Sequence, residues 1–187
     1  MTLVTLLGGA RSGKSRLAIE LASATGGRVT FVATGEARDE EMSERIAAHR
    51  RARPEGWTTI EEPHELERAV ASLPRDHAAI VDCLSLWVAN LLERGTPEDE
   101  IVASAAAAAR AASSHALLVV GVSNEVGLGI VPMSPLGRTY RDLLGTVNRL
   151  WVDASTEAAF VVGGRLLPLQ SAQGLVARAE EGTLGGD

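Results

Sequence analysis

Eight residues near the start of the chain, Gly8–Ser15, read GGARSGKS and match the pattern G-x-x-x-x-G-K-[ST]. An apolar, β-branched run, Thr2–Leu7, precedes them and predicts a buried strand, and a helical pattern begins at Lys14. Glycines let backbone N–H groups turn inward around phosphate oxygens, and the N-terminus of a helix adds partial positive charge. Gly8–Ser15 is therefore predicted to be a phosphate-binding loop between a strand and a helix, and we call it the phosphate loop.

Two side chains of the phosphate loop carry chemistry of their own. Lys14 is the only lysine, whereas the other 17 basic residues are arginines. A compact ammonium group can reach the outer phosphates of a nucleotide, and the Ser15 hydroxyl can ligate Mg²⁺. The alternative is a glycine-rich turn that matches by chance, and the strand, the helix and the single lysine all argue against it. The other expected nucleotide-binding residues of the loop are Gly8, Gly9, Ala10, Arg11, Ser12 and Gly13.

Apolar runs alternate with helical patterns along the rest of the chain. Strands are predicted at 28–33, 78–81, 116–122, 158–162 and 165–169, and helices at 14–24, 39–53, 84–92, 97–112 and 136–151. Apolar strands separated by helices are typical of a parallel sheet covered on both faces. We therefore predict an α/β fold with a doubly wound, mostly parallel sheet of the P-loop NTPase (kinase- or RecA-like) type. One domain would span 1–169, and a polar C-terminal tail would span 170–187.

Composition excludes several other classes of protein. Hydrophobic residues make up 45% of the 187 residues and charged residues 22%, which is ordinary for a folded domain. No apolar stretch approaches the roughly 20 residues of a membrane span, and a single cysteine, Cys83, excludes a disulfide framework. A net charge of -6 and an aromatic content of 3% argue against binding of nucleic acid. We expect a cytoplasmic protein with small-molecule partners, without nucleic acid and without a membrane span.

A phosphate loop needs an acidic partner for the metal at the end of another strand. Asp82 directly follows the apolar run AIV, at the carboxyl end of a predicted strand, where ligands bind in open α/β sheets. The alternative role for Asp82 is as the N-cap of the helix predicted from Leu84.

The densest run of charge, Glu36–Arg53, is acidic in its first half and basic in its second. Arg45, His49 and Arg53 lie four residues apart, so one stripe of the predicted helix carries an imidazole between two guanidinium groups. Nearby cations favour the neutral imidazole, which is the form that can attack phosphorus. The alternative is an exposed helical histidine, and the spacing alone does not choose between the two.

Several longer motifs together resemble the bifunctional adenosylcobinamide kinase / adenosylcobinamide-phosphate guanylyltransferase family of cobalamin biosynthesis. The resemblance extends over nearly the whole chain up to about Leu169. The most specific stretches are the block R-I-x-x-H-R-x-x-R-P followed by Trp57, and N-E-V-G-x-G-I-V-P. The residues that carry the resemblance are GGARSGKS at 8–15, FVATGEARDEEMSERIAAHRRARPEGWTTIEEP at 31–63, DCLSLWVANLL at 82–92, VSNEVGLGIVP at 122–132 and GRTYRDLLGTVN at 137–148.

The resemblance implies two reactions on one chain. A nucleoside triphosphate, ATP or GTP, would phosphorylate adenosylcobinamide, and GTP would then transfer GMP to that phosphate and release pyrophosphate. It also implies that His49 carries the GMP and that the chain forms a homo-oligomer. The phosphate-loop motif and the position of Asp82 predict Lys14 as a catalytic residue and Ser15 and Asp82 as ligands of Mg²⁺. Beyond the phosphate loop, the nucleotide contacts implied by the family are Ala33, Thr34, Gly35, Arg50, Arg51, Ala52, Arg53, Glu61 and Asp82.

Two other functions remain open from the residues themselves. The first is a small P-loop kinase of another metabolite, without covalent guanylylation, in which His49 and the arginines only clamp phosphates. The second is a GTP-dependent switch. Such switches commonly carry N-K-x-D, and the nearest segment here, Asn124–Gly127, has neither the lysine nor the aspartate.

Overall fold

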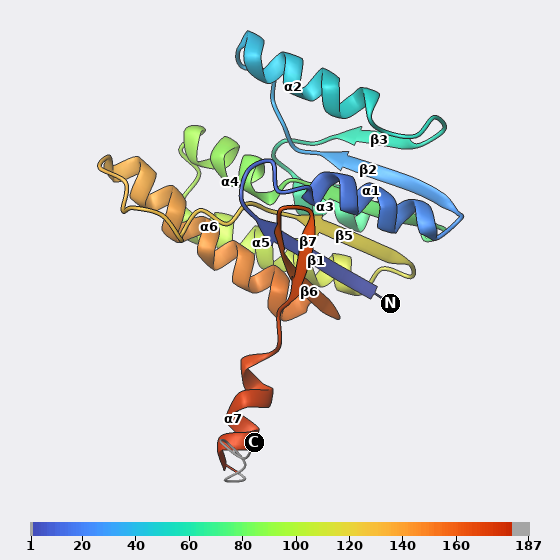
Figure 1. The fold of residues 1–187 in the computed structure, drawn as a ribbon. Coiled ribbons are helices and arrows are strands. Elements are labelled where there is room, and N and C mark those ends of the chain that lie inside the picture. Colours follow the sequence, from blue (N-terminus) through green and yellow to red (C-terminus); the bar gives the residue numbers. More distant parts are fainter. Residues whose placement is uncertain (1, 181–187) are drawn as a thin grey trace.

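The computed structural model describes residues 2–180, and seven strands within this range form one sheet in the order β3-β2-β4-β5-β1-β6-β7 (Figure 1). All pairs are parallel except β6 with β7, which is antiparallel. The strands are β1 (Thr2–Gly8), β2 (Arg28–Ala33), β3 (Thr58–Glu61), β4 (His77–Asp82), β5 (Leu118–Val122), β6 (Glu157–Val162) and β7 (Arg165–Pro168). The predicted α/β fold with a mostly parallel sheet is confirmed.

Helices cover both faces of this sheet and bury a separate apolar core on each. The helices are α1 (Lys14–Ala24), α2 (Glu40–Arg51), α3 (Leu66–Ala71), α4 (Leu84–Glu93), α5 (Glu98–Ser113), α6 (Pro135–Ala154) and α7 (Ala172–Glu180). One core packs α3, α4, α5 and α6 against the sheet, with Trp87 and Trp151 fully buried. The other packs α1 against the opposite face, through Ala18 and Ala22. The doubly wound arrangement predicted from the sequence is therefore confirmed.

The two strands that end in the phosphate loop and in Asp82 are not neighbours. β5 lies between β1 and β4 and pairs with both. Because β1, β2, β3, β4 and β5 are parallel, their carboxyl ends meet at one edge of the sheet, and β2 pairs Ala33 with Glu61 on β3 and with Asp82 on β4. The ends of these three strands therefore stand in one row beside the phosphate loop.

Three elements were not predicted from the sequence. β3 and α3 were not expected, because four residues on a half-buried edge strand and six residues of helix are too short to show a clear period. α7 occupies part of the predicted polar tail, and Figure 1 shows it lying apart from the sheet. The rest of that tail, 181–187, lies outside the described residues. Within 2–180, no helix is both long enough and apolar enough to cross a membrane.

Helix α2 ends earlier than predicted, and none of its residues is buried. It begins after Asp39, whose side chain accepts a hydrogen bond from the backbone N–H of Met42 at 2.7 Å. It ends at Arg51, with Ala52 as its C-cap, so Arg53 lies beyond the helix. The helical stripe therefore contains Arg45 and His49 but not Arg53.

Candidate active site

The phosphate loop adopts the conformation that its glycines predict. Gly13, the N-cap of α1, has φ 103°, a left-handed conformation that residues with a side chain rarely adopt. Gly8 has no room for a side chain, because a Cβ there would lie 2.4 Å from the carbonyl oxygen of Val161. The turn between β6 and β7 supports the loop from outside, where the N–H of Gly164 donates to the Ser12 carbonyl at 2.9 Å. The loop is thus fixed from both ends before any ligand binds.

Lys14 folds back over this loop and is 6% exposed. Its ammonium group donates to the carbonyl oxygens of Gly8 at 2.9 Å and Gly9 at 2.7 Å, and lies 3.4 Å from the Ser12 hydroxyl. Burial lowers the pKa of Lys14, and the charges of Cys83 and Asp82 act in the opposite direction. A phosphate in the loop would offer this buried ammonium a stronger partner than two neutral carbonyls.

Asp82 stands at the end of β4 with its side chain 10% exposed. Its Oδ2 is buried and has no hydrogen-bond partner among the described residues. The N-cap of α4 is Cys83, so the alternative role of Asp82 as a helix cap is wrong. Buried carboxylate oxygens normally have partners, and the free oxygen of Asp82 therefore suits a ligand of positive charge.

The His49 imidazole faces the Asp82 carboxylate, with Nδ1 of His49 3.8 Å from Oδ2 of Asp82. This separation is that of an ion pair rather than of a hydrogen bond. Asp82 also acts electrostatically on Lys14, so the same carboxylate influences the ammonium group of the phosphate loop and the imidazole of α2. The structure therefore brings His49, Asp82 and Lys14 into one charged cluster.

The prediction that flanking cations keep His49 neutral is wrong, because the pKa of His49 is raised and not lowered. The contact with the Asp82 carboxylate raises the pKa of His49 above its ordinary value. Partial burial and the charges of Arg45 and Arg53 lower it, as expected, but they are the smaller influences. The sequence analysis placed no carboxylate beside the imidazole, because Asp82 is on a different element.

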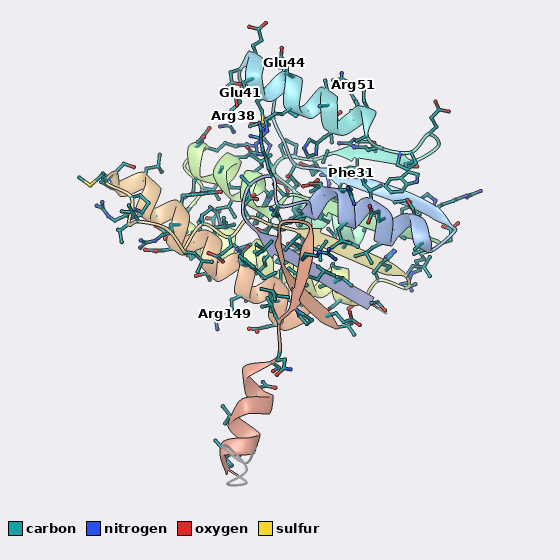
Figure 2. All side chains as sticks on the ribbon, viewed as in Figure 1. Phe31, Arg38, Glu41, Glu44, Arg51 and Arg149 are labelled. Atoms are coloured by element: carbon teal, nitrogen blue, oxygen red, sulfur yellow. The ribbon has the colours of Figure 1, made fainter. Side chains whose placement is uncertain are left out.

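The basic end of α2 contacts the edge of the sheet. Arg50 pairs with Glu61 at 2.5 Å. Arg53 lies 3.8 Å from the centre of the Phe31 ring and donates to the Thr59 hydroxyl at 3.2 Å. Arg51 is exposed and is near the C-terminal end of α2 in Figure 2, opposite the acidic end. Of the expected contacts at 50–53, Arg50 therefore reaches the row of strand ends through Glu61, whereas Arg53 contacts β2 and β3 two residues before their ends.

A hydrogen-bond clamp holds the chain where β4 ends, and the sequence analysis did not identify it. The Thr34 hydroxyl accepts from the N–H of Cys83 at 2.8 Å and donates to the carbonyl of the same residue at 2.7 Å. Asn90 of α4 donates to the Thr34 carbonyl at 2.7 Å and to the Pro63 carbonyl at 3.2 Å. Thr34 is fully buried, so its side chain fixes the backbone beside Asp82 instead of facing a ligand.

A second cluster ties the segment before α2 to α4. Arg38 contacts Glu36 at 2.6 Å, the Asn90 amide oxygen at 3.2 Å, and Glu93, and Figure 2 shows it below the N-terminal end of α2. The other carboxylate oxygen of Glu36 lies 3.1 Å from His64. Asn90 thus joins both clusters. An asparagine within the apolar run LWVANLL was the one sequence signal of such a role.

Replacing Thr34 by valine is expected to lower the free energy of unfolding by about 1–3 kcal/mol, because the buried N–H and carbonyl of Cys83 would both lose their partner. Urea denaturation measures this loss. Thr34→Ser keeps the hydroxyl and should stay close to the wild-type value. If valine and serine were equally stable, the clamp would contribute nothing to the fold.

Comparison with known proteins places the chain among a group of biosynthetic enzymes. The family described as "Cobinamide kinase / cobinamide phosphate guanyltransferase" matches residues 2–169. The bifunctional adenosylcobalamin biosynthesis protein CobP of Pseudomonas aeruginosa is 40% identical over 166 residues, which cover 88% of this chain and 95% of that protein. The corresponding protein CobU of Escherichia coli is 38% identical over 177 residues, covering 88% of this chain and 96% of its own.

Solved structures are less similar. The flagellar accessory protein FlaH from Methanocaldococcus jannaschii superposes with a TM-score of 0.45 at 16% identity, covering 88% of this chain and 74% of that one. The family match over almost the whole folded region, together with two relatives near 40% identity, leads to one conclusion: the chain belongs to the cobinamide kinase / cobinamide phosphate guanyltransferase family.

Proposed function

We propose that this chain carries out two reactions at the carboxyl edge of its sheet. It phosphorylates adenosylcobinamide with a nucleoside triphosphate, and it then transfers GMP from GTP to the adenosylcobinamide phosphate through a His49–GMP intermediate. Family membership supports both activities. In this proposal the enzyme works in the cytoplasm on small molecules, as its composition predicts, and forms a homo-oligomer, as the family resemblance implies.

The observation that carries the proposal is the orientation of His49 above Asp82. Its Nδ1 faces the carboxylate at 3.8 Å, so the proton of the neutral ring is favoured on that nitrogen. The lone pair is then on Nε2, where it is free to attack. A carboxylate that orients an imidazole and stabilises its positive charge is a familiar arrangement for histidine in catalysis. Covalent labelling of the protein by GTP distinguishes this role from that of a histidine that only clamps phosphates.

In guanylyl transfer, His49 Nε2 attacks the α-phosphorus of GTP. The new N–P bond forms as the bond from that phosphorus to the α–β bridging oxygen breaks, and pyrophosphate leaves with the electron pair. A phosphate oxygen of adenosylcobinamide phosphate then attacks the same phosphorus, the N–P bond breaks, and the imidazole is regenerated. Lys14 and the N–H groups of the phosphate loop stabilise the charge on the pyrophosphate.

In the kinase step, the hydroxyl of adenosylcobinamide attacks the γ-phosphorus. The bond to the β–γ bridging oxygen breaks, the nucleoside diphosphate leaves, and the hydroxyl proton is lost to solvent. Such transfers depend mostly on positioning and on stabilisation of charge. The rigid phosphate loop and the buried ammonium of Lys14 provide both. The kinase step therefore needs Lys14 but not His49 as a nucleophile.

The residues beside the phosphate loop fit a magnesium ion. Asp82 offers a buried carboxylate oxygen that has no hydrogen-bond partner among the described residues. Ser15 is half-buried and follows Lys14 in the first turn of α1. Within 2–180, no cluster of three or more His, Cys, Asp or Glu side chains forms a separate metal site. Asp82 and Ser15 would therefore hold the ion together with phosphate oxygens, and the ion would neutralise phosphate charge.

Labelled GTP tests this function and separates it from its alternatives. With adenosylcobinamide present, label from the γ-phosphate is expected in the corrinoid first, and label from the α-phosphate is expected next, by way of the protein. Transfer of the γ label alone would favour a metabolite kinase without guanylylation. Slow hydrolysis of GTP with neither label in an acceptor would favour a GTP-dependent switch.

The pH dependence of guanylylation should report the Asp82–His49 contact. Only neutral His49 can attack, and Asp82 raises its pKa above 6.5, so the rate of protein labelling should increase as pH rises through a midpoint above that value. Asp82→Asn removes the negative charge and should move the midpoint to lower pH. Rates of labelling by α-labelled GTP between pH 5 and 9 measure both midpoints. Because Asp82 would also hold Mg²⁺ during labelling, the His49 imidazole is titrated by NMR in both proteins without GTP and Mg²⁺, and an unchanged midpoint there would exclude the contact.

A further inference from the structure

An apolar arm, which we define as Val126–Leu136, follows β5 and leads into α6. It exposes six large hydrophobic side chains, and Leu128, Ile130 and Met133 are 80%, 97% and 95% exposed. No residue from Val126 to Gly137 is charged. Folded proteins seldom leave a contiguous apolar surface open unless it binds something. The six side chains are Val126, Leu128, Ile130, Val131, Met133 and Leu136.

The root of this arm is attached to the phosphate loop. The N–H of Glu125 donates to the Gly8 carbonyl at 3.1 Å, and the N–H of Ser123 donates to the Leu6 carbonyl at 2.9 Å. From Glu125, three residues of extended chain reach at most about 11 Å and five reach at most about 18 Å. Leu128 therefore lies within about 11 Å of Glu125, and Ile130 within about 18 Å.

Hydrogen bonds of its own give the arm a fixed shape. Arg138 donates to the carbonyls of Pro132 at 3.1 Å and Met133 at 2.8 Å. The Ser134 hydroxyl caps α6 by accepting from Gly137 at 3.1 Å. At the root, Asn148 donates to the Asn124 carbonyl at 2.9 Å. The backbone is thus held at both ends of the arm, while the apolar side chains remain exposed.

We propose that the apolar arm is the platform on which the corrinoid macrocycle of the acceptor rests during both reactions. This inference builds on the proposed function, which needs a large acceptor to present a side-chain hydroxyl, and later a phosphate, at the phosphate loop. The macrocycle has broad apolar faces, so it does not suit the charged cluster of Lys14, Asp82 and His49. The uncharged apolar arm, whose root is bonded to Gly8 through Glu125, is complementary to it. The Arg138 guanidinium that contacts the arm is engaged by the Pro132 and Met133 carbonyls.

Equilibrium dialysis of adenosylcobinamide against the full-length protein tests the platform directly. The variant carries Leu128→Gln together with Ile130→Gln. Both side chains are largely exposed, so the fold does not depend on them. We expect the Kd for adenosylcobinamide to rise by about tenfold or more, whereas labelling of the protein by α-labelled GTP stays at the wild-type rate. The matched control, Leu166→Gln with Leu167→Gln, changes two exposed leucines on β7 and should leave both measurements unchanged.

Three results would overturn the platform, of which the first two leave the proposed function intact and the third contradicts both. The first is a wild-type Kd in the arm variant. The second is weaker binding together with a lower mass in sedimentation, which would assign the arm to contact with a second copy of the chain. The third is an absence of corrinoid binding by the wild-type protein. By contrast, a wild type that binds adenosylcobinamide through the arm but transfers no label would contradict the proposed function alone.

Discussion

Replacing Lys14 by alanine is expected to remove both activities, each by on the order of a hundredfold or more, which is the usual cost of losing one strong electrostatic contact to the transition state. Both reactions leave charge on phosphate oxygens at the phosphate loop, and the ammonium group of Lys14 is the loop's one buried cation, 2.7–2.9 Å from two loop carbonyls. Initial rates of γ and α label transfer from GTP measure the two losses separately.

Arg16→Ala is the matched control for Lys14→Ala. It also removes one positive charge from the first turns of α1, but Arg16 is exposed and pairs only with Glu20, at 2.9 Å. Exposed pairs of this kind contribute little to stability, and we expect wild-type rates for both transfers. If either activity survived in Lys14→Ala at the level of Arg16→Ala, the two reactions would not share the phosphate loop.

Replacing His49 by alanine should separate the two chemistries. GMP transfer is expected to fall by about a thousandfold or more, because attack on the α-phosphorus then has no nucleophile. Phosphorylation of adenosylcobinamide should continue, because the phosphate loop, Lys14 and Asp82 remain in place. Covalent labelling of the protein by α-labelled GTP, run beside the γ-label assay, measures the contrast.

His64→Gln is the control for this experiment. His64 is half-buried and is engaged by Glu36 at 3.1 Å, so its replacement should leave covalent labelling intact. A His49→Ala protein that took up label at the wild-type level would move the nucleophile to another residue. Loss of both activities in His49→Ala would indicate that the histidine only supports the site.

The sequence predicted the parts of the site that depend on local pattern. The phosphate loop has a fixed spacing, and α1 begins at Lys14 as predicted. Asp82 follows an apolar strand, and parallel strands place their carboxyl ends at one edge. Its position could therefore be predicted even though 66 residues separate Asp82 from Ser15, the last residue of the phosphate loop.

What the sequence did not reveal depends on contacts between elements. The raised pKa of His49 comes from a carboxylate 33 positions away, and helical spacing revealed only its basic neighbours on α2. Thr34 was expected to contact nucleotide, but its hydroxyl is used twice by Cys83. The pairing of Thr34 with Cys83 follows from the register of β2 against β4. No periodicity within one segment of the sequence determines that register.

The central claim, that His49 carries GMP, is tested most directly by the intact mass of the protein after incubation with GTP and Mg²⁺. The account predicts the mass of one added GMP, located by peptide mapping at His49 and attached through Nε2. The bond should be labile in acid and stable in base, as expected for phosphorus on an imidazole nitrogen. An unchanged mass, or a GMP attached to any other residue, would contradict the account.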